Sequence, residues 1–243
     1  MPVTVTVTAL PCLSDNYAWV LRAPDGRVAV CDPGEAAPVI AAVEAMGKGL
    51  DLILLTHHHG DHVDGVKELV DRYGAKVLGA KTDAHRLPPL DIVVEPGQTV
   101  DVLGVPMKVL ASDGHTRGHV ALYFPECGFV LCGDTLFSLG CGRLIEGTAA
   151  EMFDSLQRLA ALPAETLVCC GHEYTQSNAR FALTVEPENV ALQARAKEVD
   201  ALRAAGKPTV PTTMGLELAT NPFLRARDVA TLARIRTAKD NFR

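Results

Sequence analysis

The sequence lacks any apolar run close to the roughly 20 residues that a membrane-spanning helix needs. Its opening segment, MPVTVTVTAL, alternates apolar and polar residues as a strand does and has no apolar core of the signal-peptide kind. These absences exclude an integral membrane protein. They favour a cytoplasmic protein without a membrane partner.

The sequence also lacks a C-x-x-C pair, although it contains seven cysteines. An odd number of cysteines without paired spacing disfavours a disulfide framework, and the missing pair argues against a zinc ribbon. A catalytic thiol would need a base and solvent exposure, which the strand-end positions of Cys141, Cys169 and Cys170 do not indicate. We therefore expect most of the cysteines to be small buried thiols.

An excess of positive charge is absent as well, because 23 Lys and Arg residues face 29 Asp and Glu residues, a net charge of −6. Nucleic-acid binding depends on clustered cations, so we expect no nucleic-acid partner. The cations are unevenly placed, however, since residues 176–243 contain 11 Lys and Arg against seven Asp and Glu. Such a segment suits a small anionic ligand, although exposed helices rich in arginine would give the same pattern.

The chain has 243 residues, enough for one sizeable core with an added layer or small second domain. Apolar periodicity and turn residues predict strands at 3–9, 17–22, 27–31, 52–55, 76–79, 99–102, 105–110, 120–124, 129–132 and 166–170. They predict helices at 36–46, 63–73, 149–161, 178–183, 188–205 and 229–239. We expect an α+β fold, a four-layer αββα sandwich over residues 1–172, followed by a helical C-terminal domain over residues 173–243.

Four potential metal donors crowd one short segment, Thr56-His57-His58-His59-Gly60-Asp61-His62. In an extended loop, residues two apart point the same way, so His57 and His59 can bind one metal while His58 points elsewhere. Asp61 and His62, after the bend at Gly60, can then face a second metal. A surface loop rich in histidine is the alternative, and a single metal is also compatible with this segment alone.

Three more donors stand where predicted strands give way to loops: His115, Asp134 and His172. Together with the first segment they make five imidazoles and two carboxylates. This set matches a dinuclear site in which one carboxylate bridges two ions about 3.5–4 Å apart. Asp134 is our candidate for the bridge.

The order T-H-x-H-x-D-H, G-H-T, G-D-T and G-H-E resembles the metallo-β-lactamase superfamily. Within it, five further segments resemble the glyoxalase II (hydroxyacylglutathione hydrolase) family. They are Leu13-Ser14-Asp15-Asn16-Tyr17, Gly140-Cys141-Gly142-Arg143, Glu146-Gly147-Thr148, Cys170-Gly171-His172-Glu173-Tyr174-Thr175 and Asn221-Pro222-Phe223. The resemblance covers essentially the whole chain, including its basic end.

The resemblance implies the following ligands. His57, His59 and His115 would hold metal one; Asp61, His62 and His172 would hold metal two; Asp134 and a hydroxide would be shared. The carboxylates Asp61 and Asp134 are thereby the candidate catalytic residues. The family pattern leaves His58 and His119 outside the ligand set. Asp32 is expected to orient a ligand, and a plain turn residue before Pro-Gly is the alternative.

The resemblance also implies substrate-binding residues around glutathione, namely Arg143, Tyr174, Arg236 and Lys239. Arg236 and Lys239 stand three apart in a predicted helix and so share a face, as they would on an ordinary solvated helix. Ile145 replaces an aromatic hydroxyl that some relatives carry, which predicts weaker or altered glutathione binding. Asp113 stands where a proline is common before Gly114, and the sequence does not indicate its role.

The implied activity is hydrolysis of S-(2-hydroxyacyl)glutathione, expected to be S-D-lactoylglutathione, to glutathione and D-lactate in methylglyoxal detoxification. The implied cofactors are two divalent metal ions per chain, expected to be zinc, with iron or manganese as alternatives. We expect the protein to be a monomer. The main rival is a mononuclear-iron persulfide dioxygenase acting on glutathione persulfide. A β-lactamase, a nuclease of the same fold and a non-catalytic glutathione-binding protein are further alternatives, which the missing export signal, the net charge and the intact donor set disfavour respectively.

Overall fold

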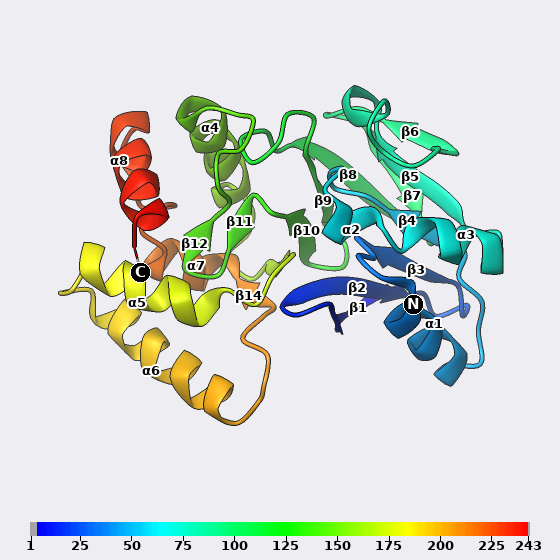
Figure 1. Ribbon diagram of the computed structural model, residues 1–243, viewed down its shortest axis with the longest axis horizontal. Coiled ribbons are helices and arrows are strands. Elements are labelled where there is room, and N and C mark those ends of the chain that lie inside the picture. Colours follow the sequence, from blue (N-terminus) through cyan, green and yellow to red (C-terminus); the bar gives the residue numbers. More distant parts are fainter. Residues whose placement is uncertain (1–3, 243) are drawn as a thin grey trace.

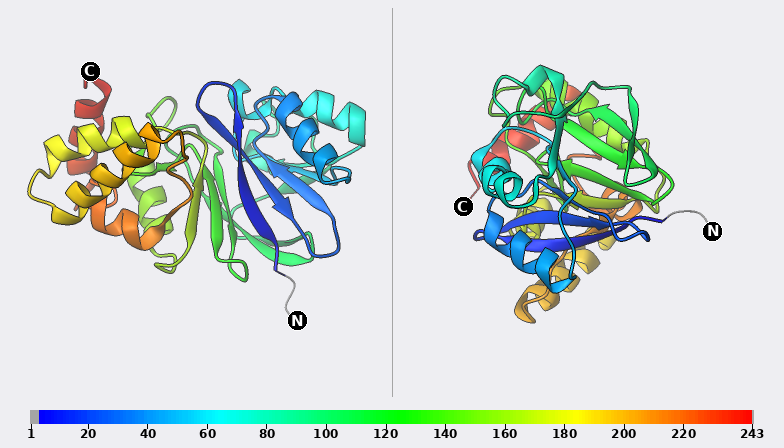
Figure 2. Two further views of the ribbon diagram at one scale, coloured as in Figure 1. Left: turned by 90° about the horizontal axis from the view of Figure 1, so that it is seen from below. Right: turned by 90° about the vertical axis from the view of Figure 1, so that its right-hand side faces the viewer.

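The computed structural model describes residues 4–242. Two sheets lie face to face in the middle of the molecule, with helices on both outer sides, and further helices extend at one end (Figures 1 and 2). The expected αββα sandwich with a C-terminal helical region is confirmed. Among the described residues, none of the helices has the length and apolar character to cross a membrane.

The first sheet has the strand order β1-β2-β3-β4-β5-β6. Its strands are β1 (Thr6–Cys12), β2 (Asn16–Arg22), β3 (Val28–Cys31), β4 (Leu52–Leu54), β5 (Lys76–Ala80) and β6 (Ile92–Val94). β1 to β3 are antiparallel, whereas β3 to β6 run parallel. The strands β3 and β4 are buried on both faces, which explains why they read as continuous apolar runs rather than as alternating ones.

Three helices accompany the first sheet: α1 (Ala36–Ala45), α2 (Gly60–Val63) and α3 (Val66–Tyr73), with the 3₁₀ turn η1 (Lys81–Asp83) after β5. Val39 and Val43 of α1 and Leu69 of α3 pack with Val30 and Ile53 of the sheet in one apolar cluster. α3 ends at Gly74, whose φ of +65° is the left-handed conformation that favours glycine at this position.

The second sheet has the order β14-β13-β10-β9-β8-β7. Its strands are β7 (Thr99–Val102), β8 (Val105–Ala111), β9 (Val120–Phe124), β10 (Phe129–Gly133), β13 (Leu167–Cys170) and β14 (Thr212–Thr213), and β11 (Leu136–Phe137) pairs with β12 (Gly140–Cys141) beside it. The main apolar cluster fills the space between the sheets and includes Trp19, Leu54, Met107 and Phe124.

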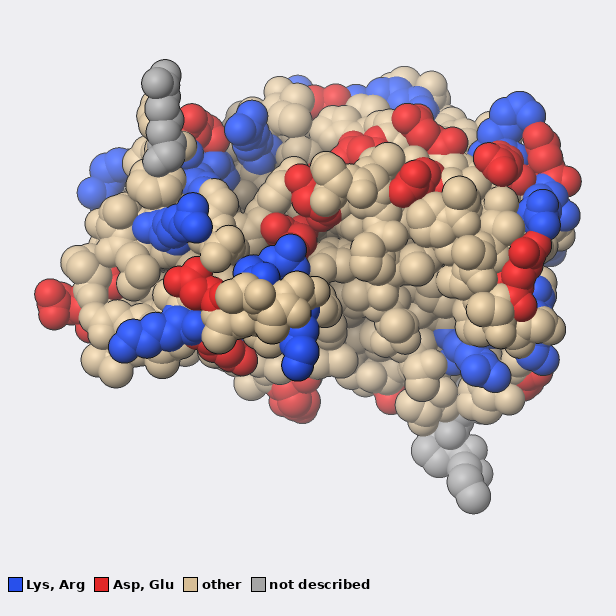
Figure 3. Space-filling view, turned by 60° about the horizontal axis from the view of Figure 1, so that its bottom comes forward, with Lys and Arg blue, Asp and Glu red and all other residues tan. Residues whose placement is uncertain are grey.

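The helix α4 (Ala149–Ala160) covers the second sheet through Met152, Leu156 and Leu159. It begins with a capping box: the Thr148 hydroxyl accepts from the Glu151 N–H, and the Glu151 carboxylate accepts from the Thr148 N–H. Residues at the C-terminal end form α5 (Thr175–Val185), α6 (Val190–Ala204), α7 (Met214–Thr220) and α8 (Val229–Asp240). On the face in Figure 3, Lys and Arg side chains are interspersed with Asp and Glu.

The structure differs from the predicted elements at several places. The first strand runs from Thr6 to Cys12, and residue 3 lies outside the described residues. β6, β11, β12 and β14 are too short to produce a periodic pattern. The Pro- and Thr-rich stretch 207–222 contains α7, a helix that begins where the Thr213 hydroxyl accepts from the Leu216 N–H.

Candidate metal centre and adjoining cleft

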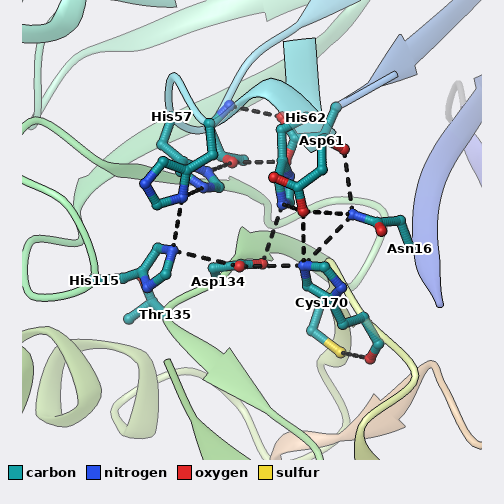
Figure 4. A network of polar contacts seen from close by, with 12 residues as sticks. Asn16, His57, Asp61, His62, His115, Asp134, Thr135 and Cys170 are labelled. Atoms are coloured by element: carbon teal, nitrogen blue, oxygen red, sulfur yellow. Dashed lines mark hydrogen bonds and ion pairs between the residues drawn. The ribbon is translucent and has the colours of Figure 1, made fainter. Parts of the chain in front are cut away.

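The donor side chains come from the carboxyl ends of strands in both sheets. The loop after β4 continues into α2 and carries His57, His59, Asp61 and His62. The loops after β8, β10 and β13 carry His115, Asp134 and His172. Because these strand ends lie at one edge of the sandwich, side chains far apart in the sequence meet there (Figure 4).

His57, His59 and His115 form one group of nitrogen donors. His59 Nδ1 lies 3.1 Å from His57 Nε2 and 3.0 Å from His115 Nε2. The opposite ring nitrogens of two of them are held by neighbours: His57 Nδ1 lies 3.0 Å from the Thr56 hydroxyl, and His115 Nδ1 donates to the Arg143 carbonyl at 2.9 Å. These outer contacts fix which nitrogens face the centre.

Asp61, His62 and His172 form a second group. Asp61 Oδ2 lies 3.7 Å from His62 Nε2 and 3.4 Å from His172 Nε2. Here too the remote nitrogens have carboxylate partners: His62 Nδ1 lies 3.1 Å from Asp32 Oδ2, and His172 Nδ1 lies 2.9 Å from Asp15 Oδ1. Each imidazole therefore presents its Nε2 atom to the centre.

Asp134 lies between the two groups. Its Oδ1 is 3.4 Å from His62 Nε2, and its Oδ2 is 3.3 Å from His172 Nε2 and 3.5 Å from His115 Nε2. Gly171 makes this approach possible, because a Cβ atom at that position would lie 2.7 Å from His62 Cε1. One carboxylate thus reaches both donor groups.

The two groups differ in their electrostatics. Burial lowers the pKa of His57 far below the ordinary value and also lowers the pKa of His59 and His115, so these imidazoles are neutral at pH 7. Burial also opposes charge on His172, but Asp134, Asp61 and Asp15 outweigh it and raise the pKa to about 10. The pKa of His62 is raised in the same way by Asp134 and Asp32.

The pKa of Asp134 itself is held well below the ordinary value: burial alone would raise it, but His62 and His172 dominate. In the metal-free protein, the positive charges of protonated His62 and His172 therefore balance the negative charge of Asp134.

The arrangement fits metal ions. Over residues 4–242, His62 Nε2 and Asp134 Oδ1 are buried without a hydrogen-bond partner, which is costly unless another group binds both atoms. Imidazole and carboxylate donors without a thiolate suit divalent cations such as zinc, iron and manganese. The fold and the two donor groups indicate a dinuclear divalent metal site.

Two histidines outside these donor groups, His58 and His119, lie next to His57. His58 Nδ1 is 3.1 Å from Asp83, a fully buried carboxylate that also accepts from Arg86. His119 stacks on His57, with ring centroids 4.7 Å apart, and its Nε2 accepts the Asp134 N–H at 3.2 Å. His119 therefore supports the backbone of the carboxylate that joins the groups.

A cleft of about 550 Å³ opens from the donors toward the helical end of the chain. Its lining includes donor side chains, the cations Arg143, Arg236 and Lys239, and the ring of Tyr174. Tyr174 stacks on His172 with the ring planes 6° apart and centroids at 4.5 Å. Donors and cations thus line one continuous cavity.

Comparison with known proteins assigns the chain to a family. The metallo-beta-lactamase superfamily model matches residues 14–172, and the model described as hydroxyacylglutathione hydrolase C-terminus matches residues 173–242. The hydroxyacylglutathione hydrolase of Acidiphilium cryptum is 55% identical over 98% of this chain and 97% of the relative. The chain belongs to the hydroxyacylglutathione hydrolase family. The enzyme of the same name from Ruegeria pomeroyi is 51% identical over 97% of this chain and 98% of its own.

Solved structures agree with the fold. ETHE1 from Myxococcus xanthus has a TM-score of 0.74 and covers 98% of this chain and 92% of that one, but at 23% identity it shows the fold alone. TTHA1623, solved in a di-iron-bound form, is 30% identical with a TM-score of 0.64, over 90% of this chain and 99% of that one.

The four residues that the hydroxyacylglutathione hydrolase resemblance implies for substrate binding all line the cleft. Two of them already make hydrogen bonds within the protein. Arg236 is buried and donates to the Cys141 carbonyl at 2.7 Å while pairing with Asp240 at 2.8 Å. Lys239 Nζ donates to the Ser177 carbonyl and hydroxyl at 3.1 and 3.0 Å. Burial, with the nearby cations Arg236 and Arg143, lowers the pKa of Lys239 to about 8.

Ile145 and Asp113, singled out in the sequence as departures from the family pattern, have clear surroundings in the structure. Ile145 lines the cleft with 59% of its surface exposed, so it presents an apolar side chain there. Asp113 Oδ1 accepts the Gly118 N–H at 2.7 Å. Asp113 therefore closes the turn that carries His115.

Several residues around the centre had no role predicted from the sequence. Asp15, in the turn before β2, contacts His172, and Asn16, the first residue of β2, contacts Asp61. Phe137, Ser177, Asn178 and Phe242 line the cleft. The segment Leu13 to Tyr17 matched the family pattern and was the one available signal for the first pair.

Proposed function

We propose that the protein hydrolyses the thioester of an S-(2-hydroxyacyl)glutathione, with S-D-lactoylglutathione as the expected substrate, giving glutathione and D-lactate. The single observation that carries this proposal is the cleft, in which the two donor groups and three cations line the same cavity. A glutathione thioester has its reactive carbonyl at one end and carboxylates further along, so it matches that order of groups. Family membership and the names of the relatives support the same reaction.

In this proposal His57, His59 and His115 hold one ion, Asp61, His62 and His172 hold the other, and Asp134 serves both. Asp61 and Asp134 are the proposed catalytic carboxylates, because both lie among the donor imidazoles. When bound, two divalent cations lower the pKa of water toward neutrality and polarise a carbonyl group. We propose zinc in both positions; the di-iron form of TTHA1623 makes iron the first alternative, and manganese is the second.

The chain's own cations bind and orient the glutathione part. Arg143 and Lys239 face the cleft and are proposed to pair with carboxylates, with Tyr174 alongside. Arg236 is held by Cys141 and Asp240, so we propose that it fixes the wall of the cleft and contributes positive charge. Lys239 is mostly protonated at pH 7 and so provides a cation there.

The reaction needs little proton transfer from the protein. A glutathione thiol has a pKa of about 8.5, so the thiolate leaves without an obligatory acid. The cleft hydroxyl of Tyr174 has its pKa raised to about 12 by burial and nearby carboxylates, and burial raises that of the Cys141 thiol to about 11. Neither group is ionised at neutral pH, which supports a reaction without a protein nucleophile.

We further propose that the boundary at residues 172 and 173 separates a metal-binding domain, residues 1–172, from a helical domain, residues 173–243, that completes the glutathione site. The matched family segments support this division. We also propose that the protein is a cytoplasmic monomer that binds neither nucleic acid nor membranes. Size-exclusion chromatography with light scattering and cell fractionation test those parts separately.

The test follows thioester loss from S-D-lactoylglutathione with purified protein before chelation, after chelation and after metal is restored. We expect activity to disappear on chelation and return with a divalent metal. An unchanged rate in the stripped protein overturns the proposal. Elemental analysis should give two metals per chain, and glutathione persulfide should cause no oxygen uptake, which separates hydrolysis from the mononuclear-iron dioxygenase alternative.

A further inference from the structure

The turn between β1 and β2 lies against the candidate metal centre. Asp15 Oδ1 is 2.9 Å from His172 Nδ1. The next residue, Asn16, is buried and donates from Nδ2 to the Asp61 carboxylate at 2.9 Å and to the Asp61 carbonyl at 3.2 Å. Figure 4 shows Asn16 pointing at Asp61 from a strand of the first sheet. Two consecutive residues thus contact two donors of the same group.

The turn is also joined to the strand end that carries His172. The Glu173 N–H donates to the Asp15 carbonyl at 2.8 Å, and the Tyr17 N–H donates to the Gly171 carbonyl at 2.7 Å. The indole N–H of Trp19 donates to the Cys170 carbonyl at 2.9 Å. Backbone bonds on both sides of His172 therefore fix its distance from the turn, so the contact with Asp15 does not depend on a mobile side chain alone.

The first donor group has no comparable support from this turn. The remote nitrogens of His57 and His115 contact Thr56 and the Arg143 carbonyl, which belong to other segments. Loss of the contacts from Asp15 and Asn16 would therefore affect one donor group and leave the other intact.

We propose that Asp15 and Asn16 are positioning residues for the second donor group, which hold His172 and Asp61 in the geometry that binds one of the two ions. Asp15 keeps the proton of His172 on Nδ1 and leaves Nε2 free to bind, and Asn16 aims the Asp61 carboxylate toward the same point. Removal of such partners typically lowers metal affinity about 10–100-fold. The inference rests on the two-metal part of the proposed function, but not on the substrate.

The test titrates metal-free protein with zinc against a chromophoric chelator, in the wild type and in the variants Asp15→Asn and Asn16→Ala. The wild type should bind two ions in separable steps. In each variant we expect one step to weaken about 10–100-fold while the other is unchanged. Asp25→Asn is the matched control, because Asp25 lies in the turn between β2 and β3, at the opposite end of β2, and contacts Arg27 there.

Two further measurements separate positioning from folding. Urea unfolding of the metal-free proteins should give similar midpoints for the wild type and Asp15→Asn, and the absorption bands of bound cobalt(II) should change for one ion only. Asp15→Glu, which keeps the carboxylate, should recover part of the lost affinity. Equal weakening of both steps, or unchanged affinity in both variants, overturns the inference. A wild type that binds one ion contradicts the two-metal proposal itself.

Discussion

His62 Nε2 and Asp134 Oδ1 face each other at 3.4 Å in a buried position. Neither atom finds a hydrogen-bond partner in the part of the chain that the structure describes. Buried polar atoms in folded proteins are nearly always satisfied, so this pair marks a place where an ion completes the structure. The remaining donors surround the same point from both sheets (Figure 4).

Removal of the metal should destabilise the protein as well as inactivate it. An ion that binds only the folded state adds about 4 kcal/mol of stability when its free concentration is about 1,000 times its dissociation constant. We expect the unfolding temperature to fall after chelation and to recover with metal, measured by calorimetry. An unfolding temperature that does not change on chelation would contradict metal binding at this site.

Replacement of the shared carboxylate should be the most damaging single change. Asp134→Asn removes the charge that contacts His62, His172 and His115, and we expect kcat to fall at least about a hundredfold. Steady-state kinetics with a metal analysis of the same samples measures this. Asp154→Asn, an exposed aspartate on α4, is the control and should retain full activity.

Metal binding should release protons, and mainly from one donor group. His172, with its pKa near 10, and His62, whose pKa is also raised, are protonated at pH 7 in the metal-free protein and must lose those protons to bind an ion. Affinity at that group should therefore rise with pH up to about pH 10, the pKa of His172. The other group, whose pKa values are lowered, is already neutral at pH 7 and should bind with little dependence on pH above that value.

Calorimetric titration in two buffers of different ionisation enthalpy counts the protons released in each step. One proton-releasing step and one proton-neutral step are expected. Equal proton release from both steps would show that the two groups do not differ in this way.

Alanine substitutions of the three cations that line the cleft should differ in their effects on substrate binding and on stability. Arg143→Ala and Lys239→Ala each remove one charged contact, and we expect KM to rise about tenfold or more with little change in kcat. Arg236→Ala should also lower the unfolding temperature, because Arg236 is buried and holds the Cys141 carbonyl. Unchanged KM in all three variants would remove glutathione from this end of the cleft.

A buried carboxylate should anchor the helical end of the chain. Glu217 of α7 is fully buried and accepts from the Ser138 hydroxyl, the Leu139 N–H and the Asn221 side chain. Glu217→Ala leaves these donors unsatisfied and should cost about 3 kcal/mol in urea unfolding. Glu188→Ala, an exposed change in the same region, is the control and should have little effect.

The sequence predicted the elements whose pattern is local. β3 and β4 are apolar because both of their faces are covered, and the capping box at Thr148 marks the start of α4. Histidines two apart after a buried strand indicated a metal site, since the backbone alternation is a local property. These features need no knowledge of distant contacts.

Other features depend on contacts that no local pattern reveals. α7 forms within a Pro- and Thr-rich stretch because Glu217 and Met214 are buried against the rest of the fold. Asp15 and Asn16 acquire their role only when β1 and β2 pack beside β13, more than 150 residues later in the chain. The family resemblance pointed to that segment without a physical reason.

The hydrogen bond from Trp19 to the Cys170 carbonyl gives the molecule an internal optical reporter. Trp19 is the single tryptophan of the sequence, is 2% exposed and is bonded two residues before His172. Intrinsic fluorescence therefore comes from one indole lodged where the two sheets meet. A change in Trp19 emission as metal ions are added would therefore report a structural change between the two sheets near His172, without an attached dye.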